Sequence, residues 1–380
     1  MFGRLIAALI AAFVLVSVGV AQGYAPNMVL VKFRSGSVGA GLLHVGALGA
    51  VPIQRVPALG VEVFLIPSNV PVEQAVRQYS GLPSVEYAEP NYIYERMVVP
   101  NDQHYGVQWA LPKISAPSAW DITTGSTTVK VAVLDTGYDT THPDLYPQVV
   151  SSKDFTILDG SPDTVQDGHG HGTHVAGTVA ALTNNSIGVA AIGWNTKLMI
   201  GKVLGNNGSG YLSEIANGIT WAADNGAKVI NMSLGGSSGS TTLQNAVNYA
   251  WNKGVVLVAA AGNAGNTRQT YPAAYTNCIA VAATTSNDSR ASFSTYGSWV
   301  DCAAPGVDIA STYKGSAYAY MSGTSMAAPH VAGLAGLVWA TSHGTSNTNV
   351  RSRIETTGDP VSSGFRNSPT RRINALKAVQ

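Results

Sequence analysis

Three histidines lie close together in the segment DGHGHGTH, residues 167–174, where glycines separate His169, His171 and His174. Imidazoles at this density suit either metal binding or proton transfer. The H-x-H-x-x-H spacing can converge on zinc, but the segment lacks the Glu of an H-E-x-x-H helix, which would activate a water. The alternative is one histidine acting as a base for a nucleophile elsewhere in the chain.

Asp135 and Ser325 offer the other two groups that such a base requires. Asp135 ends the apolar run VKVAVLD, and Ser325 stands in SGTSMA at the start of an apolar helical segment. A serine hydroxyl becomes nucleophilic when an imidazole accepts its proton and a carboxylate fixes the imidazole tautomer. Taken singly, an Asp at the end of a strand is more often a turn residue, and a Ser at a helix start is more often a cap. Their order with His171 differs from the Ser…Asp…His order of α/β-hydrolases, and GTSMA lacks the second Gly of G-x-S-x-G.

A large α/β domain must position these residues. From about Asn101, helical segments at 211–226 and 241–254 alternate with near-continuous apolar runs, as expected for parallel strands buried on both faces. We therefore predict a doubly wound, mostly parallel sheet, whose ligands collect at the carboxyl ends of its strands. The predicted strands lie within 129–135, 197–204, 227–235, 254–262 and 278–284.

A smaller unit precedes this domain. Apolar strand patterns at 28–33, 61–66 and 85–94 and an amphipathic helix pattern at 71–82 predict a small α+β domain of about 70 residues.

Composition narrows the classes of partner. The chain has 380 residues, 45% of them hydrophobic and 11% charged, with a formal net charge of +1 and no Lys/Arg cluster. We therefore expect neither a nucleic-acid partner nor binding to an anionic membrane.

The N-terminus predicts export. Arg4 precedes an apolar run at 5–20, and Gly19 and Ala21 are small, as a signal peptidase requires. An uncleaved membrane anchor is the alternative, but the run is short for a bilayer span. We expect a secreted protein without stable membrane association after signal removal.

Four blocks together carry a family resemblance. VAVLDTGYD, HGTHVAGT, VAAAGNAGN and SGTSMAAPHVAG resemble, in this order, the Asp, His, oxyanion and Ser blocks of the subtilisin-like serine proteases, and the thermitase-like branch matches best. The resemblance covers about residues 101–380, while residues 27–94 resemble the inhibitory propeptide of the same family. With the signal peptide that the N-terminal pattern predicts at 1–21, it implies a propeptide at 22–97 and a peptidase domain at 98–380.

The resemblance assigns roles to the histidines. It makes His171 the general base and His174 a structural residue, and it leaves His169 as a solvated loop residue. The zinc interpretation would leave Asp135 and Ser325 unexplained, so proton transfer is favoured. The catalytic residues implied, including an oxyanion-stabilising amide, are Asp135, His171, Ser325 and Asn263.

The resemblance also implies a cleft for extended peptides of protein substrates. Thr270 would lie at the floor of the first pocket, where no acidic residue is near in the sequence, so we expect a preference for apolar or aromatic side chains. Tyr211 would border the fourth pocket. The substrate-binding residues implied are Ser233, Leu234, Gly235, Gly208, Ser209, Gly210, Tyr211 and Thr270.

The resemblance implies calcium as the cofactor, and all-oxygen ligation is what such a hard cation prefers. Asp159, Asp163 and Asp167 offer a second ion site, or equally a solvated acidic loop. The residues implied for the first site are Asp102, Asp154, Leu182, Asn185, Ile187 and Val189.

Processing and cysteine chemistry complete the expectations. We expect a monomer that cuts itself between Met97 and Val98 and is inhibited by its propeptide until the propeptide is lost. Cys278 and Cys302 lie near the starts of consecutive strand-like segments of an exported chain and are expected to form a disulfide. The functional alternatives are a catalytically silent binding protein on the same fold and an inhibitor or chaperone module.

Overall fold

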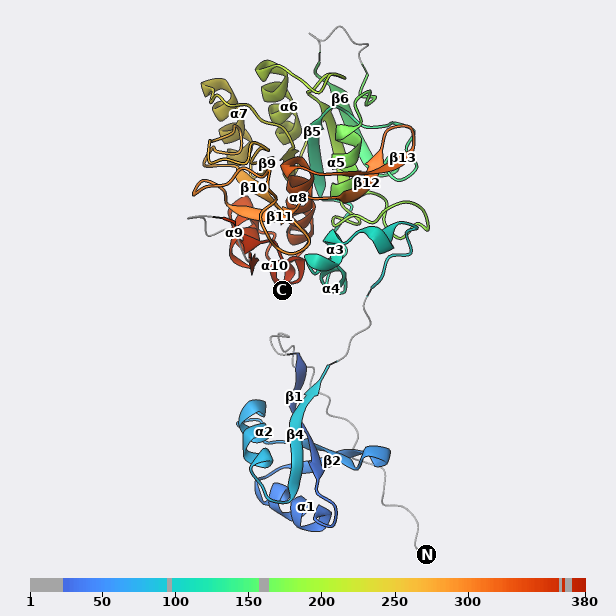
Figure 1. The fold of residues 1–380 in the computed structure, drawn as a ribbon, viewed down its shortest axis with the longest axis vertical. Coiled ribbons are helices and arrows are strands. Elements are labelled where there is room, and N and C mark those ends of the chain that lie inside the picture. The colour runs from blue at the N-terminus through green and yellow to red at the C-terminus, as the bar shows by residue number, and fades with distance from the viewer. Residues whose placement is uncertain (1–22, 94–97, 157–163, 362–363, 366–370) are drawn as a thin grey trace, which may run out of the picture. The chain divides into compact units, whose positions relative to one another are not determined.

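The computed structural model describes the chain except for residues 1–22, 94–97, 157–163, 362–363 and 366–370. The chain forms two compact units, and the boundary between them lies between Arg96 and Met97 (Figure 1). The predicted signal peptide and the residue before the predicted cleavage point lie outside the described residues, so both remain predictions. Among the helices of the described ranges, none combines the length and apolar character that crossing a bilayer requires.

The first unit is the predicted α+β domain. Its antiparallel sheet has the order β2-β3-β1-β4. Val29, Val31 and Phe64 of the sheet pack with Val45 and Tyr79 of the helices. The sequence did not reveal β2, whose residues are all exposed, or α1. The elements are β1 (Tyr24–Phe33), α1 (Val38–Ala47), β2 (Val51–Val56), β3 (Val61–Leu65), α2 (Val72–Ser80) and β4 (Val85–Tyr92).

The second unit contains the predicted doubly wound sheet. Within the described residues its order is β14-β15-β11-β10-β9-β8-β5-β7-β6. The strands run parallel from β15 to β6, and β14 is antiparallel to β15. The strands are β5 (Lys130–Asp135), β6 (Val149–Asp154), β7 (Lys197–Lys202), β8 (Val229–Met232), β9 (Val256–Ala260), β10 (Ile279–Thr284), β11 (Cys302–Pro305), β14 (Asp359–Pro360) and β15 (Arg371–Arg372).

Helices cover both faces of this sheet (Figure 1). Val131 and Val133 of β5 enter one core with the helices α5 and α8, while Ala132 and Leu134 enter a second core with α6 and α7. This alternation follows from the period of two along a strand. The helices are α5 (His171–Ala180), α6 (Leu212–Asp224), α7 (Thr241–Asn252) and α8 (Thr324–Trp339).

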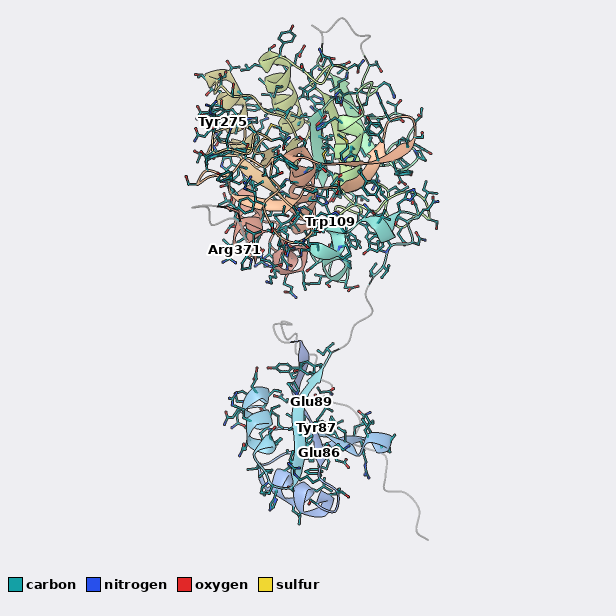
Figure 2. The ribbon with its side chains drawn as sticks, in the orientation of Figure 1. Glu86, Tyr87, Glu89, Trp109, Tyr275 and Arg371 are labelled. Atoms are coloured by element: carbon teal, nitrogen blue, oxygen red, sulfur yellow. The ribbon has the colours of Figure 1, made fainter. Side chains whose placement is uncertain are left out.

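Shorter elements close the second unit. A hairpin at residues 309–321 lies beside α5. The side chain of Trp109 donates to the carbonyl of Val307 at 3.1 Å, and that of Tyr275 donates to the carbonyl of Ser240 at 2.9 Å (Figure 2). These elements are α3 (Ala110–Lys113), α4 (Ala116–Trp120), β12 (Ile309–Tyr313), β13 (Ala317–Met321), α9 (Asn347–Thr356) and α10 (Ala375–Val379).

The expected disulfide is wrong, because both cysteines are free and buried. Cys302 pairs in register with Val281, whereas Cys278 lies three residues before Val281. At about 3.3 Å per residue the two are about 10 Å apart along the strands, beyond the reach of a bridge. They also belong to opposite cores of the sheet.

Candidate active site

Asp135 and His171 meet at the carboxyl edge of the sheet. Asp135 ends β5 and is fully buried, and His171 begins α5. The Nδ1 atom of His171 lies 2.7 Å from Oδ1 of Asp135. Close packing of the two segments sets this distance, since a Cβ at Gly172 would lie 2.2 Å from the carbonyl oxygen of Gly137.

Charge around His171 favours its protonated form. Burial lowers the pKa of His171, but the Asp135 carboxylate and Asp167 together more than offset this. The net result is a pKa above the ordinary histidine value. An imidazole in this setting can accept a proton and stay stabilised as imidazolium.

Ser325 lies in the first turn of α8, where helix N–H groups have no intrahelical acceptor. Its hydroxyl donates to the carbonyl of Ser233 at 3.2 Å. Its own carbonyl accepts from the Ser233 hydroxyl at 2.8 Å. That carbonyl is available because the residue four positions on is Pro329, which has no N–H to donate.

Asn263 lies against the start of α8. Its Oδ1 accepts from both the backbone N–H and the hydroxyl of Thr324, each at 2.9 Å. The Thr324 hydroxyl also accepts from the N–H of Gly262 at 3.0 Å. Because Oδ1 is held in this way, the amide nitrogen of Asn263 is the end of the side chain left to donate to a ligand.

The other two histidines of the segment do not converge on a common point with His171. The Nε2 of His174 faces the carbonyls of Ile309 and Ala319 at 2.9 and 3.1 Å, and burial lowers the pKa of His174 to about 4. His169 is exposed, and its ring centroid lies 6.2 Å from that of His171. Their partners fit proton transfer by His171 better than a shared zinc ion.

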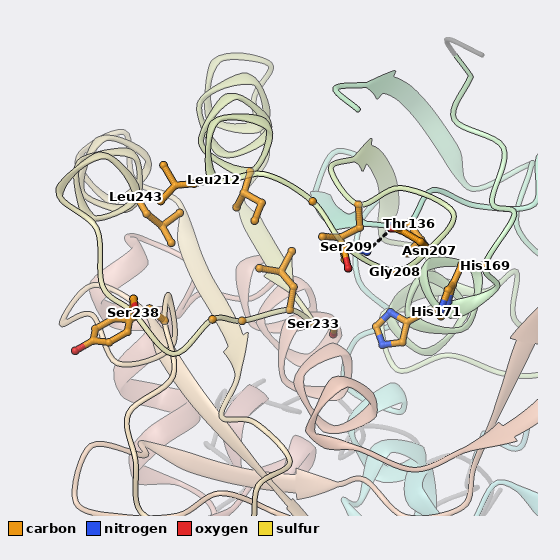
Figure 3. A pocket seen from close by; sticks show the side chains of 17 residues that line it. Thr136, His169, His171, Asn207, Gly208, Ser209, Leu212, Ser233, Ser238 and Leu243 are labelled. Atoms are coloured by element: carbon orange, nitrogen blue, oxygen red, sulfur yellow. Dashed lines mark hydrogen bonds between the residues drawn. The ribbon is translucent and has the colours of Figure 1, made fainter. Parts of the chain in front are cut away.

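A cavity of about 530 Å³ adjoins His171 (Figure 3). Tyr211 and Thr270 are not among its lining residues, but Thr270 borders it, since a Cβ at Gly235 would meet its Cγ2. Six predicted substrate residues line it: Gly208, Ser209, Gly210, Ser233, Leu234 and Gly235.

Apart from Leu234, sequence reasoning missed the leucine and isoleucine side chains that wall this cavity. Leu212 and Leu243 lie in the first turns of α6 and α7, which begin at the same edge of the sheet. Their position at helix starts was a usable signal. The remaining lining residues not predicted are Thr136, His169, Leu204, Asn207, Ile215, Gly236, Ser238 and Tyr271.

Two buried carboxylates lie near the loop at residues 182–189. Oδ2 of Asp102 accepts the N–H of Asn184 at 2.8 Å, and its buried Oδ1 has no hydrogen-bond partner among the described residues. Asp144 accepts from the amide of Asn185 at 2.7 Å and from the N–H of Val189 at 3.0 Å. Burial, with a contribution from Asp144, raises the pKa of Asp102.

The structure corrects one predicted member of this group. Asp154, at the end of β6, accepts instead from the N–H and hydroxyl of Thr156 and from the N–H of Thr164. Asp144 therefore replaces Asp154 beside Asn185 and Val189. Asp144 lies in the turn that follows β5, and this turn brings its carboxylate to the 182–189 loop. Asp154 lies further along the chain, at the end of β6.

Comparison with known proteins finds relatives along most of the chain. The family model for the Subtilase family matches residues 126–373, and that for the Fervidolysin N-terminal prodomain matches residues 16–91. Thermitase of Thermoactinomyces vulgaris is 55% identical over 74% of this chain and 99% of its own. A thermophilic serine proteinase of Bacillus sp. (strain AK1) is 51% identical over 81% of this chain and 76% of its own.

A solved structure shows the same fold. A protease from Pseudoalteromonas arctica superimposes with a TM-score of 0.70 at 37% identity and covers 74% of this chain and 99% of its own. The chain therefore belongs to the subtilase family as a thermitase-like serine protease preceded by a prodomain.

Proposed function

We propose that this protease is a secreted endopeptidase that cleaves proteins through an acyl-enzyme. The observation that carries the proposal is the 2.7 Å contact between Asp135 and His171 beside a cavity lined by residues 207–210 and 233–236. The Ser325 hydroxyl attacks the substrate carbonyl while Nε2 of His171 takes its proton. His171 then gives this proton to the leaving amine, and a water completes the second half-reaction.

Asn263 and the start of α8 stabilise the tetrahedral intermediate. The amide of Asn263 and the backbone N–H of Ser325 donate to the developing oxyanion. Support comes from the two bonds of Thr324 to Oδ1 of Asn263, which prevent the amide from turning away.

Substrate preference follows the lining of the cavity. Its walls include Leu204, Leu212, Ile215, Leu234 and Leu243, and none of the described lining residues is acidic. Such walls favour large apolar or aromatic side chains over Lys and Arg. Thr270 and Tyr211 are the proposed boundaries of the first and fourth pockets.

Calcium is the proposed stabilising ion. The orphaned Oδ1 of Asp102, the nearby Asp144 and the side-chain oxygen of Asn185 form an all-oxygen set suited to a hard cation. Backbone carbonyls of Leu182, Ile187 and Val189 are the proposed further ligands. A bound Ca²⁺ would neutralise the two buried carboxylates and tie the start of the domain to the 182–189 loop.

The prodomain is proposed to act as the intramolecular inhibitor of a monomeric enzyme. Its sheet carries exposed apolar side chains, among them Val51, Leu65, Tyr87 and Tyr92. The match of residues 16–91 to the Fervidolysin N-terminal prodomain supports this role.

Digestion of casein by the mature wild type and by single variants tests the proposal. Ser325→Ala, His171→Ala and Asp135→Ala should each lower the rate by about 10⁴-fold or more, as in subtilisin. His169→Ala is the matched control, because an exposed ring bonded to no triad member should change kcat far less. Equal losses in His169→Ala and His171→Ala would contradict the assignment, as would failure of an organophosphate to label Ser325.

A further inference from the structure

The carboxylate of Asp167 lies buried between the two segments that carry Asp135 and His171. Asp167 is 2% exposed and precedes His171 by four residues. Among the acidic residues of the segment at 159–167, Asp159 and Asp163 lie outside the described residues. Asp167 itself takes no part in the proposed chemistry.

On one side Asp167 holds the start of α5. Its Oδ1 accepts the backbone N–H groups of His169 and Gly170 at 2.9 and 2.8 Å. Its Oδ2 accepts the N–H and hydroxyl of Thr173 at 2.9 and 2.6 Å. One carboxylate thus satisfies donors on both sides of His171, at the helix end where a negative charge is most favourable.

On the other side Asp167 holds the residue that follows Asp135. The hydroxyl of Thr136 donates to Oδ1 of Asp167 at 2.9 Å and accepts from the N–H of Gly172 at 2.8 Å. The N–H of Thr136 donates to Oδ1 of Asp135 at 2.8 Å, the oxygen that faces His171. Asp167 is therefore linked through Thr136 to both members of the pair.

These bonds also show whether the Asp167 carboxylate binds a cation or the protein's own hydrogen-bond donors. An ionised carboxylate offers about four acceptor sites, and five protein donors already approach Asp167. No acceptor capacity is left for a cation ligand. The acidic side chain is used to bind the protein's own backbone and hydroxyl groups.

We propose that Asp167 is a positioning residue of the protease, whose buried carboxylate joins the Asp135 segment to the start of α5 and so sets the geometry between Asp135 and His171. The inference rests on the proposed roles of those two residues. Misplacing a catalytic pair by about 1 Å can cost about 100-fold in rate, so a single clamp at this point has a large effect on turnover.

Asp167 also acts on His171 through its charge. The groups that face His171 are Asp135 on β5, Asp167 and His169 in the preceding loop, and His174 one turn further along α5. Lys202 on β7 lies in register with Asp135. Removing the negative charge of Asp167 lowers the pKa of His171, and weakening the Asp135 contact lowers it again, so both effects have the same sign.

Asp167→Asn is the direct test, with Asp139→Asn as a matched control. Asp139 is also buried and also accepts from a threonine, Thr141, and from the N–H of Ser316, but it bonds neither Thr136 nor Gly170. Each mature enzyme is titrated with a serine-directed inhibitor, so that rates refer to active sites. We expect Asp167→Asn to lower kcat about 10- to 100-fold, to change KM much less, and to move the acid limb of kcat/KM to lower pH. Asp139→Asn should lower the melting temperature without moving that limb.

A pair of Thr136 variants provides a second test if the Asp167→Asn protein does not mature. Thr136→Val keeps the side-chain shape but removes the hydroxyl between Asp167 and Gly172, whereas Thr136→Ser restores it. We expect Thr136→Val to lower kcat and Thr136→Ser to recover most of the loss. Wild-type kcat and pH profile in Asp167→Asn would overturn the inference, as would the same shift in Asp139→Asn or equal losses in both Thr136 variants. Failure of the proposed function itself would differ, since His171→Ala would then remain active.

Discussion

Oδ1 of Asp135 lies 2.7 Å from Nδ1 of His171, so a carboxylate at the end of β5 fixes the ring that begins α5. This contact predicts the pH dependence of the enzyme. Burial lowers the pKa of His171, but Asp135 and then Asp167 raise it above the ordinary value of about 6.5. Because the neutral ring is the active base, kcat/KM should fall as the pH drops through this raised pKa.

Asp135→Asn should move that acid limb to lower pH and lower kcat by about 10⁴-fold, as the same change does in a related triad. Initial rates on an uncharged peptide across the acidic range, at constant ionic strength, provide the measurement. An unshifted limb in Asp135→Asn would assign the titration to another group.

The bonds between Thr324 and Asn263 predict a graded loss of oxyanion stabilisation. Asn263→Ala should lower kcat about 10²- to 10³-fold, the size seen for such a donor in subtilisin. Thr324→Val removes the hydroxyl bonded to Oδ1 of Asn263 but leaves the N–H bond, so its loss should be smaller. Thr324→Ser retains the hydroxyl and serves as the control. Equal kcat in the Val and Ser variants would show that the hydroxyl does not orient the amide.

Calcium should stabilise the folded protease through Asp102 and Asp144. At a calcium concentration of 100 times Kd an ion contributes about 2.7 kcal/mol, or about 5–10 °C in Tm for a domain of this size. Melting curves with calcium and with excess chelator give the shift. We expect Asp144→Asn and Asp102→Asn to lose the shift and Asp154→Asn to keep it. A shift lost only in Asp154→Asn would restore the sequence-based assignment.

The two cysteines should remain thiols in the folded enzyme. Burial is the main cause that raises the pKa of both Cys278 and Cys302, so thiolate is scarce and native reactivity is slow. Titration of the denatured, unreduced protein should give two thiols per chain, and the folded protein should react far more slowly. Fewer than two thiols would show a bridge or an oxidised side chain.

Sequence was most informative where burial imposes a pattern. The strands that end at Asp135 and precede Asn263 are continuously apolar, and α5 and α8 are apolar on nearly all sides. Their ends were therefore visible, and with them the positions of His171 and Ser325. The exposed β2 and the half-exposed β6 carry no such pattern and were not predicted.

Spatial relationships that depend on turns were harder to predict from the sequence. Asp144 and Asp154 are separated by only ten positions, and the turn after β5 decides which one reaches the 182–189 loop. That loop winds tightly, with positive φ at Asn184, Ser186 and Gly188. Likewise the register of β10 with β11, which separates Cys278 from Cys302, depends on packing that the two sequences do not specify.

Self-cleavage between Met97 and Val98 should create a new ion pair with Asp121. The backbone nitrogen of Val98 lies 2.9 Å from Oδ1 of Asp121. Before cleavage this nitrogen is a neutral amide, and afterwards it is an α-ammonium, which forms a stronger, charge-assisted bond. Asp121→Asn should therefore lower the Tm of the mature enzyme more than that of the unprocessed Ser325→Ala precursor.

N-terminal sequencing of the active enzyme should give Val98, and Ser325→Ala expressed alone should accumulate with its prodomain attached. The two Tm differences then give the effect of Asp121→Asn once with a charged and once with a neutral nitrogen at Val98. Residue 325 and the prodomain are the same within each of the two comparisons, so their own contributions cancel. An N-terminus beyond Asp102 would refute the cleavage position, since Asp102 must stay in the protease to reach the 182–189 loop. Equal Tm losses in precursor and mature protein would mean that Asp121 holds a neutral backbone group in both, because a new ammonium facing a carboxylate must favour the mature form.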